Sequence, residues 1–77
     1  MRGYSQSIVE ANHEATPSLG VALGAVCISL KYPLAKVAKE LGVSRQAVYD
    51  WFSGKTKPAR DKEILINELI QRLIIEY

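Results

Sequence analysis

Three residues near the middle of the chain, Arg45, Gln46 and Tyr49, carry side chains suited to the recognition of another molecule. When residues 45–53 are placed on a helix at 100° per residue, these three share one polar side. The opposite side collects the apolar residues of the stretch, which are Ala47, Val48, Trp51 and Phe52. An arginine fork pairs well with guanine and a glutamine carboxamide with adenine. We therefore predict that Arg45, Gln46 and Tyr49 contact base edges of DNA.

Positive charge gathers around this stretch. Residues 31–62 contain eight Lys and Arg residues against three Asp and Glu residues, although the whole chain carries a formal charge of only +2. Such a local field attracts a phosphate backbone, and hydroxyl groups at helix ends can also bind phosphate oxygens. The predicted phosphate contacts are Ser44, Ser53, Lys55 and Lys57. Asp50 has three alternative roles: it could accept from a cytosine amino group, disfavour wrong bases, or pair with Lys55.

The segment before residue 45 is predicted to hold this helix in place. Its apolar residues recur at i, i+3, i+4 and i+7, the spacing of one helical face: Leu34, Val37, Ala38 and Leu41. Gly42 follows, and glycine commonly ends a helix at positive φ. Val43 can fill the corner, and Ser44 is a good N-cap for the next helix. Residues 34–53 therefore read as two short helices joined by a glycine turn.

This stretch resembles the helix-turn-helix of the lambda repressor and Cro-like (XRE-type) DNA-binding family. The matching residues are Ala38, Gly42, Val43, Val48 and the run Trp51-Phe52-Ser53-Gly54. The resemblance implies an all-α, lambda-repressor-like domain of four helices, or five, in which helices 2 and 3 form the motif. It also implies that the second helix of the motif lies in the major groove of double-stranded DNA.

The chain departs from the family pattern at Pro33 and Leu34. Members of the family often have a serine cap and a glutamine there, and the glutamine contacts phosphate. Proline suits the start of a helix, but leucine cannot make those hydrogen bonds. Many relatives also have a further helix after the last one predicted here, and a dimer contact could take its place.

Two regions of unequal length are expected: a flexible N-terminal arm, residues 1–15, and a helix-turn-helix domain, residues 16–77. The arm shows no sustained apolar period, so we predict that it is disordered or folds on a partner. Its Arg2 and Tyr4 could reach a groove, as the arms of some DNA-binding domains do.

The first core helix is predicted to start at Thr16-Pro17-Ser18 and to run to about Lys31. Gly20 and Gly24 lie inside it. Because glycine costs a helix about 1 kcal/mol relative to alanine, two of them indicate a close approach of another backbone within the domain. The single Cys27 is interpreted as a small core residue.

A last helix is predicted from near Ala59 towards Ile75, after the loop signal Thr56-Lys57-Pro58. Its apolar stripe is wider than one packed face needs, so part of it is expected to contact a second copy of the chain. The candidates for this dimer contact are Ile66, Ile70, Leu73 and Ile74.

The expected function is sequence-specific binding of double-stranded DNA by a small Cro- or repressor-like transcriptional regulator of phage or bacterial type, acting as a homodimer. The alternative is a protein-interaction module, such as an antitoxin or an assembly component, whose last helix captures a different protein. Self-association of the chain would distinguish the first hypothesis from the second.

Several other classes of function are not indicated by the sequence. No nucleophile, base and carboxylate stand at a usable spacing, so we predict no enzyme activity. His13 is alone and no metal-ligand set can be assembled, so we predict no metal site, no cofactor and no small-molecule ligand. No apolar run approaches the ~18 residues needed to cross a membrane, and a cytoplasmic protein is expected.

Overall fold

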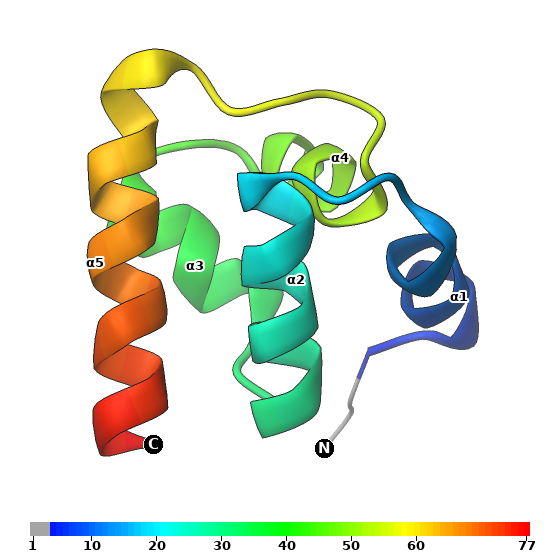
Figure 1. Ribbon diagram of the computed structural model, residues 1–77, viewed down its shortest axis with the longest axis horizontal. Helices are drawn as coiled ribbons and strands as arrows, with labels where there is room; N and C mark the ends of the chain where they lie inside the picture. The colour runs from blue at the N-terminus through cyan, green and yellow to red at the C-terminus, as the bar shows by residue number, and fades with distance from the viewer. Residues whose placement is uncertain (1–3) are drawn as a thin grey trace.

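In the computed structural model, residues 4–77 are described and form five α-helices joined by short connections (Figure 1). The helices are α1 (Gln6–Glu14), α2 (Leu19–Leu30), α3 (Leu34–Leu41), α4 (Arg45–Ser53) and α5 (Arg60–Glu76). The described part of the chain contains no strand, so the predicted all-α class is confirmed. The two helices that were predicted as the second and third are α3 and α4.

Helix boundaries follow the capping residues. Ser18 caps α2 by accepting from the amide of Val21, so α2 begins after Ser18 and not at the predicted Thr16. At the other end Lys31 takes a left-handed conformation with φ of 61°. The amide of Lys31 bonds the carbonyl of Ile28, and the amide of Tyr32 bonds the carbonyl of Cys27. This pattern satisfies two carbonyls that the last turn of α2 would otherwise leave unpaired.

The prediction of a flexible arm at residues 1–15 is wrong for residues 6–14, which form α1. Ser5 caps this helix by accepting from the amide of Ile8. Ile8 is only 2% exposed and Asn12 is also buried, so one face of α1 packs on the rest of the domain. Arg2 lies outside the described residues. The fifth helix therefore precedes the predicted four and does not follow them.

Tyr4 also differs from its predicted role at a DNA groove. Its hydroxyl donates to the backbone carbonyl of Tyr32, and its ring packs on Phe52 with ring centres 6.1 Å apart. Burial raises the pKa of the Tyr4 phenol, as expected for a hydroxyl held inside a fold. Tyr4 therefore fastens the start of α1 to the domain.

Close packing of α2 against α4 explains the two glycines. A Cβ on Gly20 would lie 2.9 Å from Trp51 Cβ, and one on Gly24 would lie 2.8 Å from Phe52 Cγ. Real Cβ atoms essentially never come so near, so only glycine lets α2 approach α4 at this distance. The predicted close approach within the domain is confirmed.

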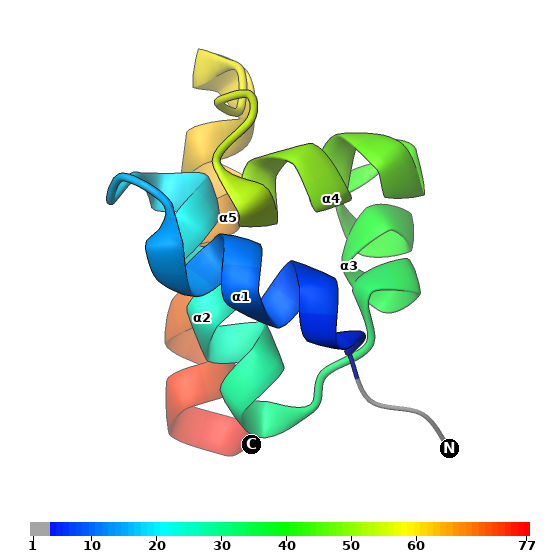
Figure 2. The ribbon, with the colours of Figure 1, turned by 90° about the vertical axis from the view of Figure 1, so that its right-hand side faces the viewer.

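The core lies between all five helices (Figure 2). Its fully buried side chains include Leu23, Cys27, Val37, Val48, Phe52 and Ile66. Cys27 is 0% exposed, and burial, with a smaller contribution from the Glu40 charge, raises the pKa of its thiol to about 12. These properties support the interpretation of Cys27 as a small core residue.

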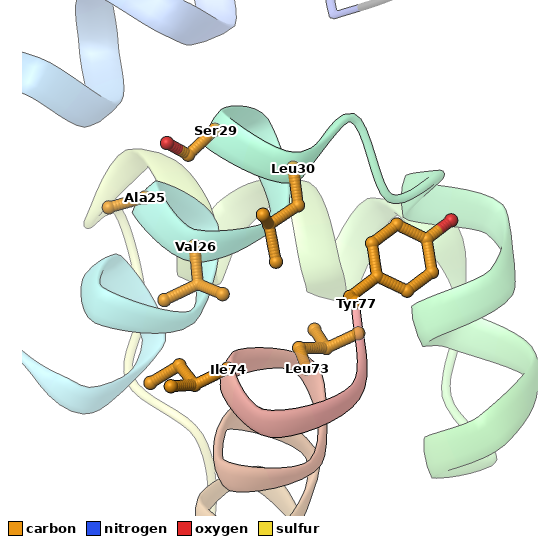
Figure 3. A pocket seen from close by; sticks show the side chains of 7 residues that line it. All are labelled: Ala25, Val26, Ser29, Leu30, Leu73, Ile74 and Tyr77. Carbon is orange, nitrogen blue, oxygen red and sulfur yellow. The ribbon is translucent and has the colours of Figure 1, made fainter.

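Helix α5 buries only some of its apolar side chains and leaves the others exposed. Ile66 is 0% exposed and Leu73 is 2% exposed, so these two side chains pack in the core of the chain itself. Ile70 is half-buried, whereas Ile74 is exposed and lines a hollow between α2 and α5 (Figure 3). Two of the four predicted dimer candidates therefore pack in the core, and the dimer contact itself stays a prediction. No helix in the described residues is long and apolar enough to cross a membrane.

Candidate nucleic-acid interface

The turn between α3 and α4 is built by three consecutive residues. Gly42 ends α3 with φ of 69°, a left-handed conformation that glycine adopts without steric cost. The amide of Val43 bonds the carbonyl of Ala38 over 3.0 Å, which closes the end of α3. Ser44 Oγ then accepts from the amide of Ala47 over 3.1 Å and starts α4. The predicted glycine turn and N-cap both occur.

The apolar face of α4 fixes the orientation of the helix. Val48 and Phe52 are 0% exposed and Trp51 is 5% exposed, so this face is fully packed against the domain. Arg45, Gln46 and the 36% exposed Tyr49 lie on the opposite, solvent-facing side. The three predicted base-reading residues therefore sit together on one accessible face of a helix that its core residues hold in place.

Two of the polar residues on α4 pair with each other. Gln46 Nε2 donates to Asp50 Oδ1 over 3.0 Å, one helical turn away. Among the described residues Asp50 forms no ion pair, so the suggested pairing with Lys55 is absent. Instead, the backbone carbonyl of Asp50 accepts from the amides of Lys55 and Thr56. Asp50 thus holds the Gln46 carboxamide and orders the start of the following loop.

The loop after α4 exposes the predicted phosphate-binding lysines. Gly54 ends α4 with φ of 80°, and Lys55 and Lys57 are both exposed beyond it. Ser53 Oγ donates to the carbonyl of Asp50 over 3.3 Å, so its proton is already engaged. Ser44 Oγ only accepts in its cap, which leaves its own proton free to donate to an anion.

A residue outside the motif, Asn12 of α1, positions the end of α4. Its Nδ2 donates to the carbonyl of Phe52 over 2.7 Å and to that of Val21 over 3.0 Å. Both bonds are buried, so they tie α1, α2 and α4 together. The sequence interpretation missed Asn12. The signal that could have found it is the i, i+4 spacing from Ile8 behind a serine cap.

Helix α5 supports α3 at two points. Lys62 Nζ donates to the carbonyl of Leu41 over 3.0 Å, so this lysine helps to close the end of α3. Arg72 forms an ion pair with Glu40, which also accepts from the hydroxyl of Tyr32. Lys62, which belongs to the basic region of the sequence, therefore has a structural contact.

The charge of Glu40 is stabilised by these neighbours. Burial by itself would raise the pKa of this carboxyl, but the hydrogen bonds from Tyr32 and Arg72 and the nearby positive charges outweigh it, so the pKa lies below its ordinary value. For Tyr32, burial and then the bond to Glu40 raise the pKa to about 12. Within residues 4–77 no group of three or more His, Cys, Asp or Glu residues is placed to hold a metal ion.

Comparison with known families gives one match. A family model described as Helix-turn-helix matches residues 23–69, more than half of the chain, and so includes all of α3 and α4. Helix α1, with Asn12, lies before the matched segment. No curated protein and no solved structure gave a match.

Proposed function

Because the chain belongs to the lambda repressor-like family of helix-turn-helix proteins, which bind DNA, we propose that it is a small sequence-specific regulator of transcription that acts as a homodimer. The observation that carries this proposal is the division of α4 into two faces. One face is packed in the core, and the other presents Arg45, Gln46 and Tyr49 to solvent.

In the proposed complex, α4 enters the major groove of a DNA duplex. Arg45 donates to a guanine, and Gln46 and Tyr49 contact neighbouring bases. The hydrogen bond between Gln46 and Asp50 supports this role, because it restricts the carboxamide before binding and so lowers the entropy lost on contact. Asp50 also places a negative charge beside the groove, which disfavours bases that offer only acceptors.

The phosphate contacts are proposed to come from both ends of α4. Ser44 is at the N-terminal end, where the free amides and the helix dipole also favour an anion. Lys55 and Lys57 follow the C-terminal end and are exposed. These contacts release counterions and fix the position of the domain on the duplex, while the bases set the sequence preference.

The test is fluorescence-anisotropy binding of the full chain to a pool of random duplexes over a series of salt concentrations. We expect affinity to fall steeply with salt, and repeated selection from the pool to enrich a common sequence. Absence of binding even at low salt would contradict the proposal. Salt-dependent binding without any enriched sequence would contradict the base-reading part of it.

A further inference from the structure

Gln46 and Asp50 lie one turn apart on the polar side of α4, and their side chains are bonded to each other. Gln46 Nε2 donates to Asp50 Oδ1 over 3.0 Å. A carboxylate can only accept hydrogen bonds, so the nitrogen of the carboxamide, and not its oxygen, has to face Asp50. The bond therefore fixes which way round the Gln46 carboxamide lies.

The backbone that carries this pair is held by the core. Val48 lies between the two residues and Phe52 follows them, and both of these side chains are 0% exposed. The backbone carbonyl of Asp50 also accepts from the amide of Lys55 over 2.9 Å. Asp50 thus has a fixed backbone position one helical turn from Gln46, the spacing at which glutamine and aspartate bond on a helix surface.

The bond to Asp50 changes what Gln46 can offer to a base. A glutamine carboxamide has two N–H donors and one carbonyl acceptor. When one N–H is given to Asp50, one donor and the carbonyl oxygen remain. Adenine offers one acceptor, N7, and one donor, the N6 amino group, side by side in the major groove. Guanine offers two acceptors, N7 and O6, so a contact with two hydrogen bonds would need both N–H groups.

We propose that Asp50 is a specificity-determining residue that acts through Gln46: it retains one N–H of the carboxamide, so that Gln46 selects adenine and rejects guanine. This inference rests on the proposed function and names the base that one position of α4 selects. Gln46 is in the first turn of α4, the part of a recognition helix that contacts base edges, whereas Asp50 is in the second turn. Gln46 therefore makes the contact, and Asp50 is a positioning residue.

The bond between the two side chains gains importance when α4 enters the groove. In the free chain water competes for both groups, so breaking the bond costs little. In the groove that water is displaced, and a carboxylate without a donor becomes costly. Pairing with guanine would leave Asp50 in this state, facing two further acceptors. Within residues 4–77 no Lys or Arg forms an ion pair with Asp50 that could replace the lost donor.

The experiment measures binding of the full chain to duplexes that differ at one base pair, by fluorescence anisotropy. The position that Gln46 reads is the position of the selected site at which Gln46→Ala removes the base preference. We expect adenine there, with guanine bound about tenfold more weakly. A preference of the unmodified chain for guanine at this position would overturn the proposal.

Asp50→Asn is the informative variant, because it keeps the shape of the side chain but can donate as well as accept. It can bond the carbonyl oxygen of Gln46 and so free both N–H groups for guanine. The ratio of adenine affinity to guanine affinity should therefore fall about tenfold, to near one. Circular dichroism of the variant, which changes a side chain at the surface, verifies that the domain is folded.

Asp61→Asn is the matched control, because it removes the same charge from an exposed residue at the start of α5. Loss of a negative charge by itself should strengthen binding to all duplexes alike, so the control should keep the adenine-to-guanine ratio of the unmodified chain. The same uniform gain in Asp50→Asn, with an unchanged ratio, would overturn the proposal, since Asp50 would then act only through its charge.

A double substitution tests whether Asp50 acts through Gln46. In a chain that already carries Gln46→Ala, Asp50→Asn should leave the adenine-to-guanine ratio unchanged. A shift of the same size without Gln46 would contradict the proposal, because Asp50 would then contact a base directly. The two proposals fail in different ways. Absence of any enriched sequence would count against the proposed function, whereas an enriched site that does not respond to Asp50→Asn would count against this inference alone.

Discussion

The carboxamide of Asn12 links three helices through one nitrogen atom, which donates to the carbonyls of Val21 and Phe52. Both carbonyls lie inside the fold, where water cannot replace the lost donor. Arg45, Gln46 and Tyr49 of α4 differ from Asn12 because they are exposed, and the partners proposed for them are the bases of a DNA duplex. Substitution of Asn12 should therefore change the stability of the fold, whereas substitutions on the exposed face of α4 should change DNA binding.

Asn12→Ala should lower the free energy of unfolding by about 1–3 kcal/mol, because it leaves buried acceptors without a donor. Chemical denaturation followed by circular dichroism measures this loss. Asn67→Ala, on the exposed side of α5, is the matched control and should change stability by less than about 0.5 kcal/mol. An equally small effect at Asn12 would show that α1 is not held by these bonds.

Arg45→Ala should weaken binding to the selected duplex by about 1–3 kcal/mol and relax the sequence preference at one position. Lys57→Ala is its counterpart, since a phosphate contact should weaken binding to all duplexes alike and reduce the salt slope by about one. Anisotropy titrations with the selected site and with single-base variants measure both effects. Equal loss on every duplex for Arg45→Ala would assign Arg45 to phosphate and not to a base.

At the scale of elements, the contact between α3 and α5 depends on a charge. Glu40 of α3 accepts from Tyr32 and pairs with Arg72 of α5, while Lys36 lies over the Tyr32 ring, 5.2 Å from its centre. This group joins the first helix of the motif to the last helix of the domain. The stability that this group contributes should therefore decrease when Glu40 becomes protonated.

The pKa of Glu40 lies below its ordinary value, because hydrogen bonds and positive charges lower it more than burial raises it. This direction sets the sign of the effect of pH on stability. The stabilising contribution of the Glu40 charge is present above the ordinary pKa of 4.5 and is lost as the pH falls through the lower, folded-state value. Glu40→Gln should therefore be less stable than the unmodified chain near neutral pH, and the difference should shrink in acid. Denaturation midpoints across this range measure it, with the exposed Glu68→Gln as a control that should leave the profile nearly unchanged. A difference in stability between Glu40→Gln and the unmodified chain that stays constant with pH would show that the charge of Glu40 does not stabilise the fold.

At the scale of the whole molecule, the rate at which a thiol reagent labels Cys27 shows whether the five helices unfold together. Cys27 is 0% exposed at the centre of the core, and its pKa near 12 leaves almost no thiolate at neutral pH. A thiol reagent should therefore react slowly with the native chain and only through opening of the fold. Asn12→Ala should speed the reaction about tenfold if it costs about 1.4 kcal/mol, because the open population rises by that factor. Rapid labelling of the unmodified chain would show that the core opens locally around α2.

The motif could be predicted from the sequence because its signals are local. Gly42, Ser44 and Gly54 act within a helical turn of their own positions, and the alternation of polar and apolar residues in α4 requires only the helical period. These features gave the turn, the orientation of α4 and the exposure of Arg45, Gln46 and Tyr49 without knowledge of any distant contact. Their proposed contacts with bases stay a prediction.

Tertiary structure alone decided which of several suitable surfaces is covered. Helix α1 forms because Ile8 and Asn12 find partners on α2 and α4, and nothing within residues 1–15 reveals those partners. On α5, Ile66 and Leu73 are buried while Ile74 is exposed, although all three belong to the apolar stripe that the sequence predicts for this helix. Periodicity shows that a helix has an apolar stripe, but the width that is buried depends on which helices the fold places beside it.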